Sequence, residues 1–292
     1  MTEKIPNASQ GENRARGARR APPLGVWLLA SGLILALVVV GFYMAGVPLE
    51  AGREDEPTGA EVDDPDAGPV PVLLVPGWRD TDQELAPFRQ RFLDAGWPEE
   101  RVSALEFEDP VGGNVEHAEE VRDAVAELRA TTEAERVDVV AHSMGGLAVR
   151  YYLRFLGGDE EVRRAVFLGT PHRGTVLAFL AWGDGAQEML PGSEFLEALN
   201  DGRAVPENVQ ALALRTPLDL HILPSSSAIL PGVHNVEVCC PTHPGMIDDD
   251  NTFQAVTQFL EAGPDLPDPF LPERFLPEWD DLVERIGARE AG

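Results

Sequence analysis

One ten-residue stretch constrains the fold of this chain more than any other. Residues 137–146 read VDVVAHSMGG, an apolar run that stops at a serine enclosed by small residues. Residues 146–156, GLAVRYYLRFL, follow directly and have the apolar spacing of a helix. A strand that passes at once into a helix needs a sharp backbone turn, which small residues permit. The stretch therefore predicts a buried strand, a tight turn with Ser143 at its apex, and a helix.

Short apolar runs alternate with helical patterns over the central part of the chain. Buried strands are expected at 71–75, 102–107, 137–141, 165–169, 218–223 and 235–240. Helices are expected at 82–95, 114–130, 146–156 and 252–262, the last capped by Asp250 or Asn251. Continuous apolar strands that alternate with helices predict an α/β fold, with a mostly parallel sheet covered by helices on both faces.

The N-terminal part of the chain has the pattern of a membrane anchor. Residues 24–47 carry no charge, and this length exceeds the roughly 20 residues that a helix needs to cross a bilayer. Basic residues cluster in 1–23 and acidic residues follow residue 48, which predicts an extracytoplasmic orientation of the remainder. A cleaved secretory signal is the alternative, and the remainder would then be secreted.

The flanking segments and the net charge limit the partners of the chain. Residues 48–69 are acidic and rich in Pro and Gly, which is typical of a disordered stalk. Residues 263–292 hold several prolines and aromatic residues and are expected to form a C-terminal arm. The net charge of −27 argues against a nucleic-acid partner, because duplex binding requires clustered positive charge.

The turn after residue 142 has the chemistry of a nucleophile elbow. Ala141, Ser143 and Gly145 match the G-x-S-x-G pattern, with Ala at its first position. Such a turn exposes the serine hydroxyl at the carboxyl end of the sheet and directs the N–H of Met144 toward a developing oxyanion. The loop after the strand at 71–75 reads PGW, so the N–H of Trp78 is the expected second donor.

Among the six histidines, His243 is the candidate general base. It follows the last expected strand and precedes the last helix, and the order of a triad in this type of fold is serine, acid, histidine. The other histidines are interpreted as structural: His117 on an exposed helix, His142 packed beside the elbow, His172 and His234 in loops, and His221 within a strand.

Four segments resemble the α/β-hydrolase bacterial lipases and esterases, in particular the actinobacterial class 2 lipases. These segments are LLVPGW, VDVVAHSMGGLAVRYYL, FLGTPHRGT and MLPGSEFLEALN, in this order, and the likeness covers about residues 70–262. The resemblance implies an α/β-hydrolase domain and ester hydrolysis through an acyl-enzyme. It also implies that no cofactor or metal is required.

The expected position of the triad acid contains no carboxylate. Lipases of this type place an Asp just after the strand that precedes the histidine loop, and that position here is Ser227, in the run Ser-Ser-Ser. Three interpretations remain open. A carboxylate arrives from elsewhere, such as Asp248, Asp249 or Asp250; Ser227 orients His243 as a Ser–His dyad; or the site has decayed.

Residues 174–216 are expected to form a small helical cap insert. The segments TVLAFLAW and SEFLEALN of this insert carry apolar residues that would line a site for acyl chains. A lipid or ester substrate is therefore expected. An acyltransferase is the alternative among enzymes, and a pseudo-hydrolase that binds lipid or a protein is the alternative outside them. Cys239 and Cys240 would point to opposite faces of a strand, which favours two separate thiols, with a strained vicinal bridge in an oxidising compartment as the alternative.

Overall fold

The computed structural model describes residues 69–263, which form a six-stranded sheet in which every neighbouring pair is parallel. The strand order is β2-β1-β3-β4-β5-β6. The strands are β1 (Val72–Val75), β2 (Val102–Ala104), β3 (Val137–His142), β4 (Val162–Leu168), β5 (Gln210–Arg215) and β6 (His234–Glu237). The prediction of an α/β fold with a mostly parallel sheet is confirmed.

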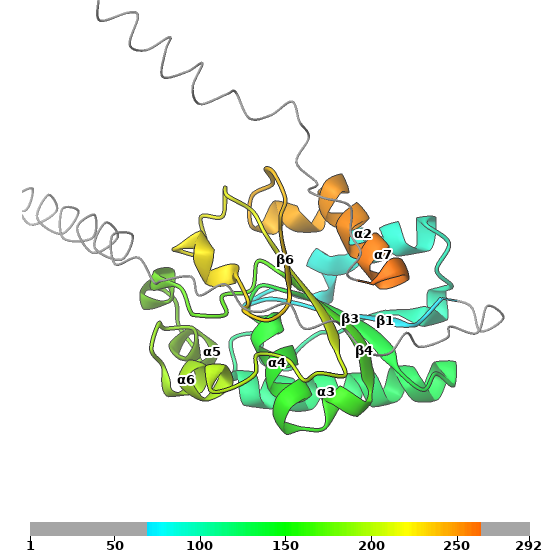
Figure 1. Cartoon of the computed structure of the whole chain (residues 1–292), viewed down its shortest axis with the longest axis horizontal. Helices are drawn as coiled ribbons and strands as arrows, with labels where there is room; N and C mark the ends of the chain where they lie inside the picture. The colour runs from blue at the N-terminus through cyan, green and yellow to red at the C-terminus, as the bar shows by residue number, and fades with distance from the viewer. Residues whose placement is uncertain (1–68, 264–292) are drawn as a thin grey trace, which may run out of the picture. The chain divides into compact units, whose positions relative to one another are not determined.

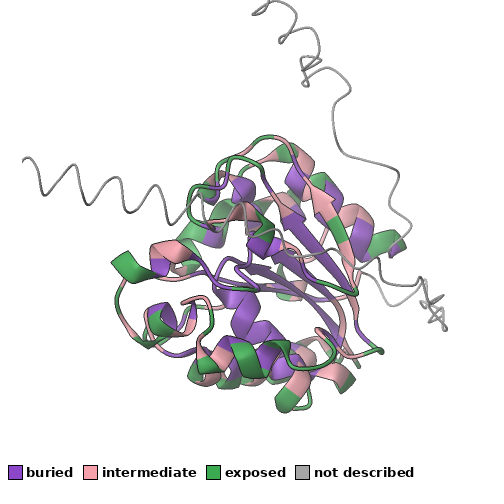
Figure 2. Ribbon diagram, turned by 60° about the vertical axis from the view of Figure 1, so that its left-hand side comes forward, coloured by how far each residue is buried: buried purple, intermediate pink, exposed green. Residues whose placement is uncertain are grey.

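Helices cover both faces of this sheet (Figure 1). One face carries α2 (Asp82–Asp94) and α7 (Asp250–Ala262), and the other carries α3 (Asn114–Thr132) and α4 (Gly145–Phe155). Because successive strand side chains point to opposite faces, Leu73 packs in the α3 and α4 cluster while Val72 packs in the α2 and α7 cluster. Figure 2 shows the resulting buried layer in the sheet and on the inner sides of the helices.

The ends of the helices follow local capping chemistry. Thr81 and Glu84 form a capping box at the start of α2, and the side chain of Asp249 accepts the Thr252 N–H at the start of α7. The cap of α7 is therefore Asp249 and not Asp250 or Asn251. On α3, His117 is buried and stacks on Phe107, so its predicted exposure is wrong.

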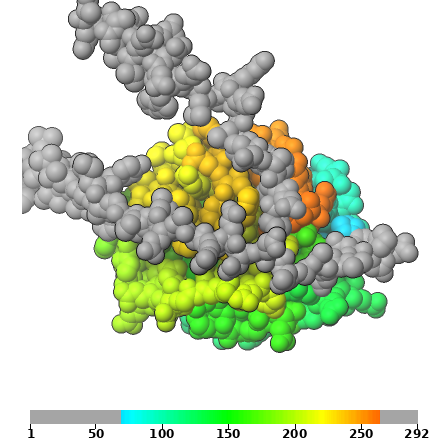
Figure 3. All heavy atoms as spheres, viewed as in Figure 1, coloured from blue at the N-terminus to red at the C-terminus, as the bar shows by residue number. Residues whose placement is uncertain are grey.

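The cap insert is shorter than predicted. It contains η3 (Val176–Leu180), α5 (Asp184–Glu188) and α6 (Glu194–Asn200), which pack on Met144 and Leu147 of the elbow region. In Figure 3 this part of the chain (yellow-green) lies beside α3 and α4 (green). The rest of the predicted insert at 174–216 is not helical, because Gln210–Arg215 forms β5 and pairs with β4.

The prediction of a strand at 218–223 is wrong. This segment is an irregular turn, in which Asp219 Oδ1 accepts the N–H groups of His221 and Ile222, both at 2.8 Å. A side chain that hydrogen-bonds its own backbone two and three residues ahead competes with strand pairing. The remaining short helices are η1 (Glu99–Arg101), η2 (Gly158–Glu160), η4 (Ser225–Ala228) and η5 (Pro244–Ile247).

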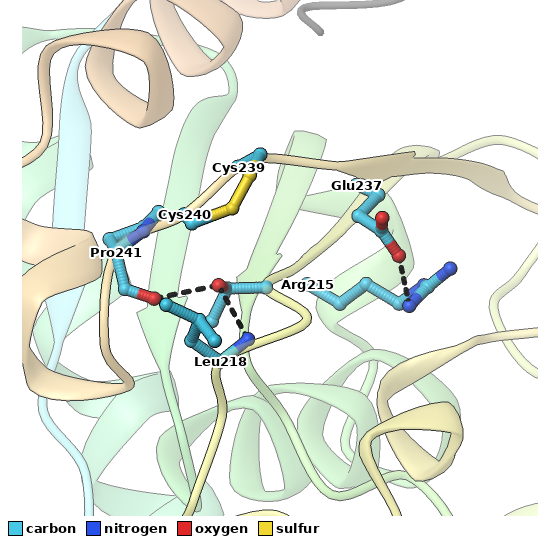
Figure 4. The surroundings of a disulfide bond; sticks show 7 residues. Arg215, Leu218, Glu237, Cys239, Cys240 and Pro241 are labelled. Atoms are coloured by element: carbon cyan, nitrogen blue, oxygen red, sulfur yellow. Dashed lines mark hydrogen bonds and ion pairs between the residues drawn. A yellow bond between two sulfur atoms is a disulfide. The ribbon is translucent and has the colours of Figure 1, made fainter. Parts of the chain in front are cut away.

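Cys239 and Cys240 form a disulfide between neighbours (Figure 4). The expectation of two separate thiols is wrong, because β6 ends at Glu237 and the cysteines lie in the loop beyond it, joined by a cis peptide bond. On the preceding strand, Arg215 pairs with Glu237. The disulfide therefore lies in the loop that leads from β6 to His243.

Both ends of the described chain lie at the amino end of the strands. The Pro71 carbonyl accepts the N–H of Asp138 at 2.8 Å, and the Leu260 carbonyl, near the end of α7, accepts a bond from Arg163 at 2.8 Å. The basic segment 1–23, the span at 24–47 and nearly all of the stalk at 48–69 lie outside the described residues, as does the arm beyond Gly263. Within 69–263, none of the helices combines the length and apolarity needed to cross a bilayer.

Candidate active site

The turn after β3 holds Ser143 in a strained backbone conformation. Its φ of 52° lies in the left-handed region, which is uncommon for a residue other than glycine. The Ser143 N–H is fixed by the Leu168 carbonyl of β4 at 2.8 Å, and the residue is only 8% exposed. α4 begins at Gly145, so the strand, apex and helix occur where the sequence predicts them.

The two glycines after the apex are required by close packing. A Cβ at Gly145 would lie 2.2 Å from the Pro76 carbonyl oxygen, and one at Gly146 would lie 2.0 Å from Thr170 Oγ1. Neither contact is sterically possible, so only glycine lets α4 start this close to the loops after β1 and β4. These contacts seat the elbow against Pro76, two residues before Trp78.

The turn after β1 carries the second expected oxyanion donor. Trp78 lies in a turn closed by a bond from the Asp80 N–H to the Gly77 carbonyl at 3.3 Å. Its indole N–H donates to the Trp182 carbonyl at 3.2 Å, and the two indole rings meet edge to face at 5.0 Å. The turn that carries Trp78 is thereby joined to the cap insert.

His243 has a carboxylate partner, and that partner is Asp219. The His243 Nδ1 lies 2.7 Å from Asp219 Oδ2, and both residues are buried. The ring of His243 lies 4.7 Å from the ring of His142, the residue directly before Ser143. The structure therefore brings an aspartate–histidine pair to the neighbourhood of the elbow.

Asp219 and His243 are held by bonds between their two loops. Asp219 Oδ1 is occupied by two backbone N–H groups, which leaves Oδ2 for the imidazole. Thr216 Oγ1 donates to the Pro241 carbonyl at 2.6 Å and accepts the Leu218 N–H at 3.3 Å, as the dashed lines of Figure 4 show. One hydroxyl thus connects the loop of the acid with the loop of the histidine.

Of the three interpretations of the missing acid, the geometry agrees with a carboxylate from elsewhere, although it is Asp219 and not one of the residues suggested for it. Ser227 does not contact His243: its hydroxyl donates to the Gly174 carbonyl at 2.5 Å and accepts the Arg173 N–H at 3.1 Å. Asp249 caps α7 and Asp250 pairs with Arg91, so neither serves His243. The argument for decay also lapses, because an acid is present. Asp219 was missed because 218–223 was interpreted as the strand itself, so the acid was sought beyond it.

Comparison with known proteins identifies the family. The family model described as Lipase (class 2) matches residues 69–223, more than half of the chain. The chain belongs to the class 2 lipases. This family agrees with the resemblance that the sequence motifs carry.

Solved structures share the fold of this class 2 lipase at low sequence identity. Lipase B of Aspergillus fumigatus superposes with a TM-score of 0.59 at 22% identity, over 66% of this chain and 52% of that one. The mature lipase BlEst2 of Bacillus licheniformis gives 0.59 at 17% identity, over 69% of this chain and 96% of that one. The present chain thus spans about half the length of the fungal lipase and nearly all of the bacterial one.

Electrostatics favour a charged acid and a neutral base in this class 2 lipase. Burial acts to raise the pKa of Asp219, but the bond and charge of His243 and two backbone N–H groups outweigh it and lower that pKa. Burial lowers the pKa of His243, an effect opposed by Asp219 and reinforced by the charges of His142 and His221. The result is an ionised Asp219 beside an imidazole able to accept a proton near neutral pH.

The other histidines of this class 2 lipase differ in their relation to the site. His221 lies in the turn after Asp219, and its ring stacks on His243 at 5.0 Å. Burial holds the pKa of His172 well below its ordinary value, and its ring packs edge to face on Phe167. His234 is part of β6, away from the Asp219 turn. His142 contacts both His243 and Asp80.

The surface near the acid of this class 2 lipase is apolar. Leu218 and Leu220 flank Asp219 and are 51% and 71% exposed. The insert is tied to this turn, because Thr175 Oγ1 donates to the His221 carbonyl at 2.8 Å and accepts the Leu223 N–H at 3.0 Å. Large exposed side chains follow on the insert: Phe179, Leu180 and Trp182. Both of these bonded segments therefore carry large exposed apolar side chains.

Proposed function

We propose that this class 2 lipase hydrolyses lipid-type carboxylic esters through an acyl-enzyme formed on Ser143. The observation that carries the proposal is the 2.7 Å bond between Asp219 and His243, on loops beside a serine at the apex of an elbow. The chain order Ser143, Asp219, His243 is that of the α/β-hydrolase triad.

The proposed reaction has two halves, acylation and deacylation of Ser143, and His243 accepts and then donates a proton in each. Ser143 Oγ attacks the ester carbonyl carbon while its proton passes to His243 Nε2, the nitrogen not bonded to Asp219. The N–H groups of Trp78 and Met144 stabilise the oxyanion, and the alcohol leaves with the proton from His243. Water, deprotonated by His243, then attacks the acyl carbon; the bond to Ser143 Oγ breaks, His243 returns the proton to that oxygen, and the carboxylic acid is released. Asp219 keeps the second ring proton on Nδ1 throughout.

The substrate class follows from the apolar surface beside the acid. Leu218, Leu220, Phe179 and Leu180 are exposed to water and give an acyl chain a favourable contact area. A short polar ester would leave that area unused. We therefore expect the ratio kcat/KM to rise with acyl length between butanoate and dodecanoate esters.

We also propose that the enzyme is held at the membrane with residues 69–263 outside the cytoplasm. The support is the uncharged stretch 24–47, with basic residues before it and acidic residues after it. The disulfide of Cys239 and Cys240 fits an oxidising compartment. Protease treatment of intact cells should remove the domain, and sodium carbonate should leave residual full-length chain in the membrane fraction.

The experiment for the activity is fluorophosphonate labelling with a matched variant. The wild-type chain should be labelled and should release a burst of p-nitrophenol from p-nitrophenyl dodecanoate close to one equivalent. Ser143→Ala should lose the label, the burst and turnover to background. An unlabelled wild-type protein that retains its fold would contradict the proposal. Product analysis with added alcohol separates hydrolysis from acyl transfer, since a dominant new ester would point to the transferase.

A further inference from the structure

A second aspartate–histidine pair lies beside the proposed triad, with its histidine buried and its aspartate partly exposed. His142, the last residue of β3, is buried, and its Nδ1 lies 3.1 Å from Asp80 Oδ2. His142 is joined through the chain to Ser143, so whatever fixes this ring also restrains the elbow. The proposed reaction gives neither His142 nor Asp80 a role, which leaves the pair to be explained.

Asp80 connects His142 to the turn that carries Trp78. Asp80 Oδ2 accepts the Gly77 N–H at 3.2 Å as well as facing His142. A Cβ at Gly77 would lie 2.7 Å from that oxygen and 2.9 Å from the Ser143 Cβ, so these groups are packed tightly. Moving Asp80 would therefore move the proposed donor at Trp78.

The other nitrogen of His142 faces the loop of the base. His142 Nε2 lies 3.3 Å from the backbone carbonyl oxygen of His243, and the two rings are 4.7 Å apart with a 38° tilt. A single imidazole thus touches the turn of Trp78 through Asp80, the elbow through the chain, and the base through its carbonyl. These are the three parts whose relative positions set the proposed reaction geometry.

The ring of His142 lies between two oxygen atoms. One ring nitrogen faces the Asp80 carboxylate and the other faces the His243 carbonyl, so the ring links the turn after β1 to the loop after β6. The titratable groups around it are Asp80 from the turn after β1 and His243 from the loop after β6, with Asp219 and His221 beyond.

We propose that Asp80 and His142 form a positioning pair that holds the Trp78 turn and the His243 loop in register with Ser143. This inference rests on the proposed function, because it assigns the pair to that reaction. In this proposal neither the Asp80 side chain nor the His142 side chain contacts the substrate. The pair acts through Gly77, the elbow and the His243 carbonyl.

The charges around the pair agree with this role. Burial acts to raise the pKa of Asp80, but the bond and charge of His142 and the Gly77 N–H outweigh it, so that pKa is lowered and the carboxylate stays ionised. The charge of His142 is among the influences that lower the pKa of His243.

The first test compares three variants with a matched control. His142→Asn, Asp80→Asn and the double variant should each lower kcat roughly ten- to a hundred-fold, with KM within about two-fold, because a small misplacement of reacting groups is costly. The double variant should be no worse than the worse single variant, since the pair acts as a unit. His117→Asn removes an equally buried histidine whose ring bonds the Asp109 carbonyl and stacks on Phe107, and it should leave kcat unchanged.

The second test is the pH profile, which a merely structural role would not move. In His142→Asn the Asp80 carboxylate is left uncompensated, so the acid limb of kcat/KM should move up by about half a unit or more. In Asp80→Asn it should not move up. Asp80 is partly exposed, so this variant serves if His142→Asn fails to fold.

The outcomes separate this inference from the proposed function. An active wild-type enzyme whose His142→Asn and Asp80→Asn variants keep kcat within about two-fold overturns the positioning pair alone. A loss of kcat with an unmoved acid limb, matched by His117→Asn, also overturns it. A wild-type protein without fluorophosphonate labelling overturns the proposed function, and this inference with it.

Discussion

The two ends of the parallel strands each bury an aspartate beside a basic side chain, with opposite results. At the amino end, Asp138 of β3 accepts two bonds from the Arg163 guanidinium, at 3.1 and 2.7 Å, and one from the Arg164 N–H at 3.1 Å. At the carboxyl end, Asp219 accepts two backbone N–H groups and faces His243. Both carboxylates are buried and both have three partners.

The difference lies in whether the basic partner of the aspartate can gain and lose a proton. Arg163 stays charged and is held further by the Leu260 carbonyl, so its pair with Asp138 is a fixed link between β3, β4 and α7. His243 can gain and lose a proton at its second nitrogen, so its pair with Asp219 can take part in chemistry. Burial raises the pKa of Asp138 despite the arginines, whereas the pKa of Asp219 is lowered. The same residue type therefore serves structure at one edge and the proposed reaction at the other.

The largest expected effect is at the carboxyl end. Asp219→Asn should lower kcat by about 10⁴-fold, because the amide favours the wrong tautomer of His243 and cannot stabilise the imidazolium. The free energy of unfolding should change little by comparison. Steady-state kinetics on p-nitrophenyl esters and urea unfolding measure the two quantities.

The control for Asp219→Asn is Ser227→Ala, at the position where the sequence pattern places the acid. The Ser227 hydroxyl bonds to the loop at 173–174 and not to His243, so kcat should stay within about three-fold of wild type. A larger loss in Ser227→Ala than in Asp219→Asn would reverse the assignment.

The next largest effect is expected from a substitution at the amino end of the strands. It should lower the free energy of unfolding and leave kcat unchanged. Asp138→Asn leaves the Arg163 guanidinium without its carboxylate and should lower the free energy of unfolding by about 3 kcal/mol. Its kcat at 25 °C should be unchanged, because the strands still hold the elbow. A folded Asp138→Asn enzyme with strongly reduced kcat would break the division between the two edges.

Arg150 is a further buried basic side chain, and it sharpens the comparison of the two strand ends because its hydrogen-bond partners carry no charge. Arg150 of α4 donates to the carbonyls of Leu199 and Ala204 and to the Asn200 side chain, at the end of α6. Arg150→Met should lower the free energy of unfolding by about 2 kcal/mol, since a cation at a helix carboxyl end is removed. Arg154→Met, at a more exposed position of α4, should cost less in the same unfolding measurement.

The smallest expected effect is a shift in pH dependence. The lowered pKa of His243 predicts that the acid limb of kcat/KM lies below the ordinary histidine value of 6.5, because a base is active only when unprotonated. In Asp219→Asn the limb should move lower still, since the carboxylate favours the protonated ring. A wild-type limb above 6.5 would contradict the assigned environment.

The elbow could be predicted from the sequence because its causes are local. The strand at 137–142, the left-handed apex at Ser143 and the helix after it depend on neighbouring residues and on glycines forced by Pro76 and Thr170. His243 could be predicted from its place in the chain order. Its pairing with a carboxylate could not, because it depends on the path of a distant loop.

Asp219 was not identified as the acid because the alternation of residues around it resembles that of a strand. Leu218, Leu220 and Ile222 alternate with polar residues as in a half-buried strand, but the first two are exposed and Asp219 turns the chain on itself. The true strand, Gln210–Arg215, follows a helical insert and lacks a run of bulky residues. An Asp directly after a short strand was the available signal, once that strand was assigned correctly.

Both ends of the described chain leave from the amino side of the strands. The protein can therefore be attached to a support through that side. A resin, a display scaffold or a fusion protein joined next to residue 69 or residue 263 would meet the edge with Asp138, on the opposite side from Ser143 and His243. Immobilised preparations attached at either end should therefore keep the turnover of the free enzyme toward bulky emulsified esters.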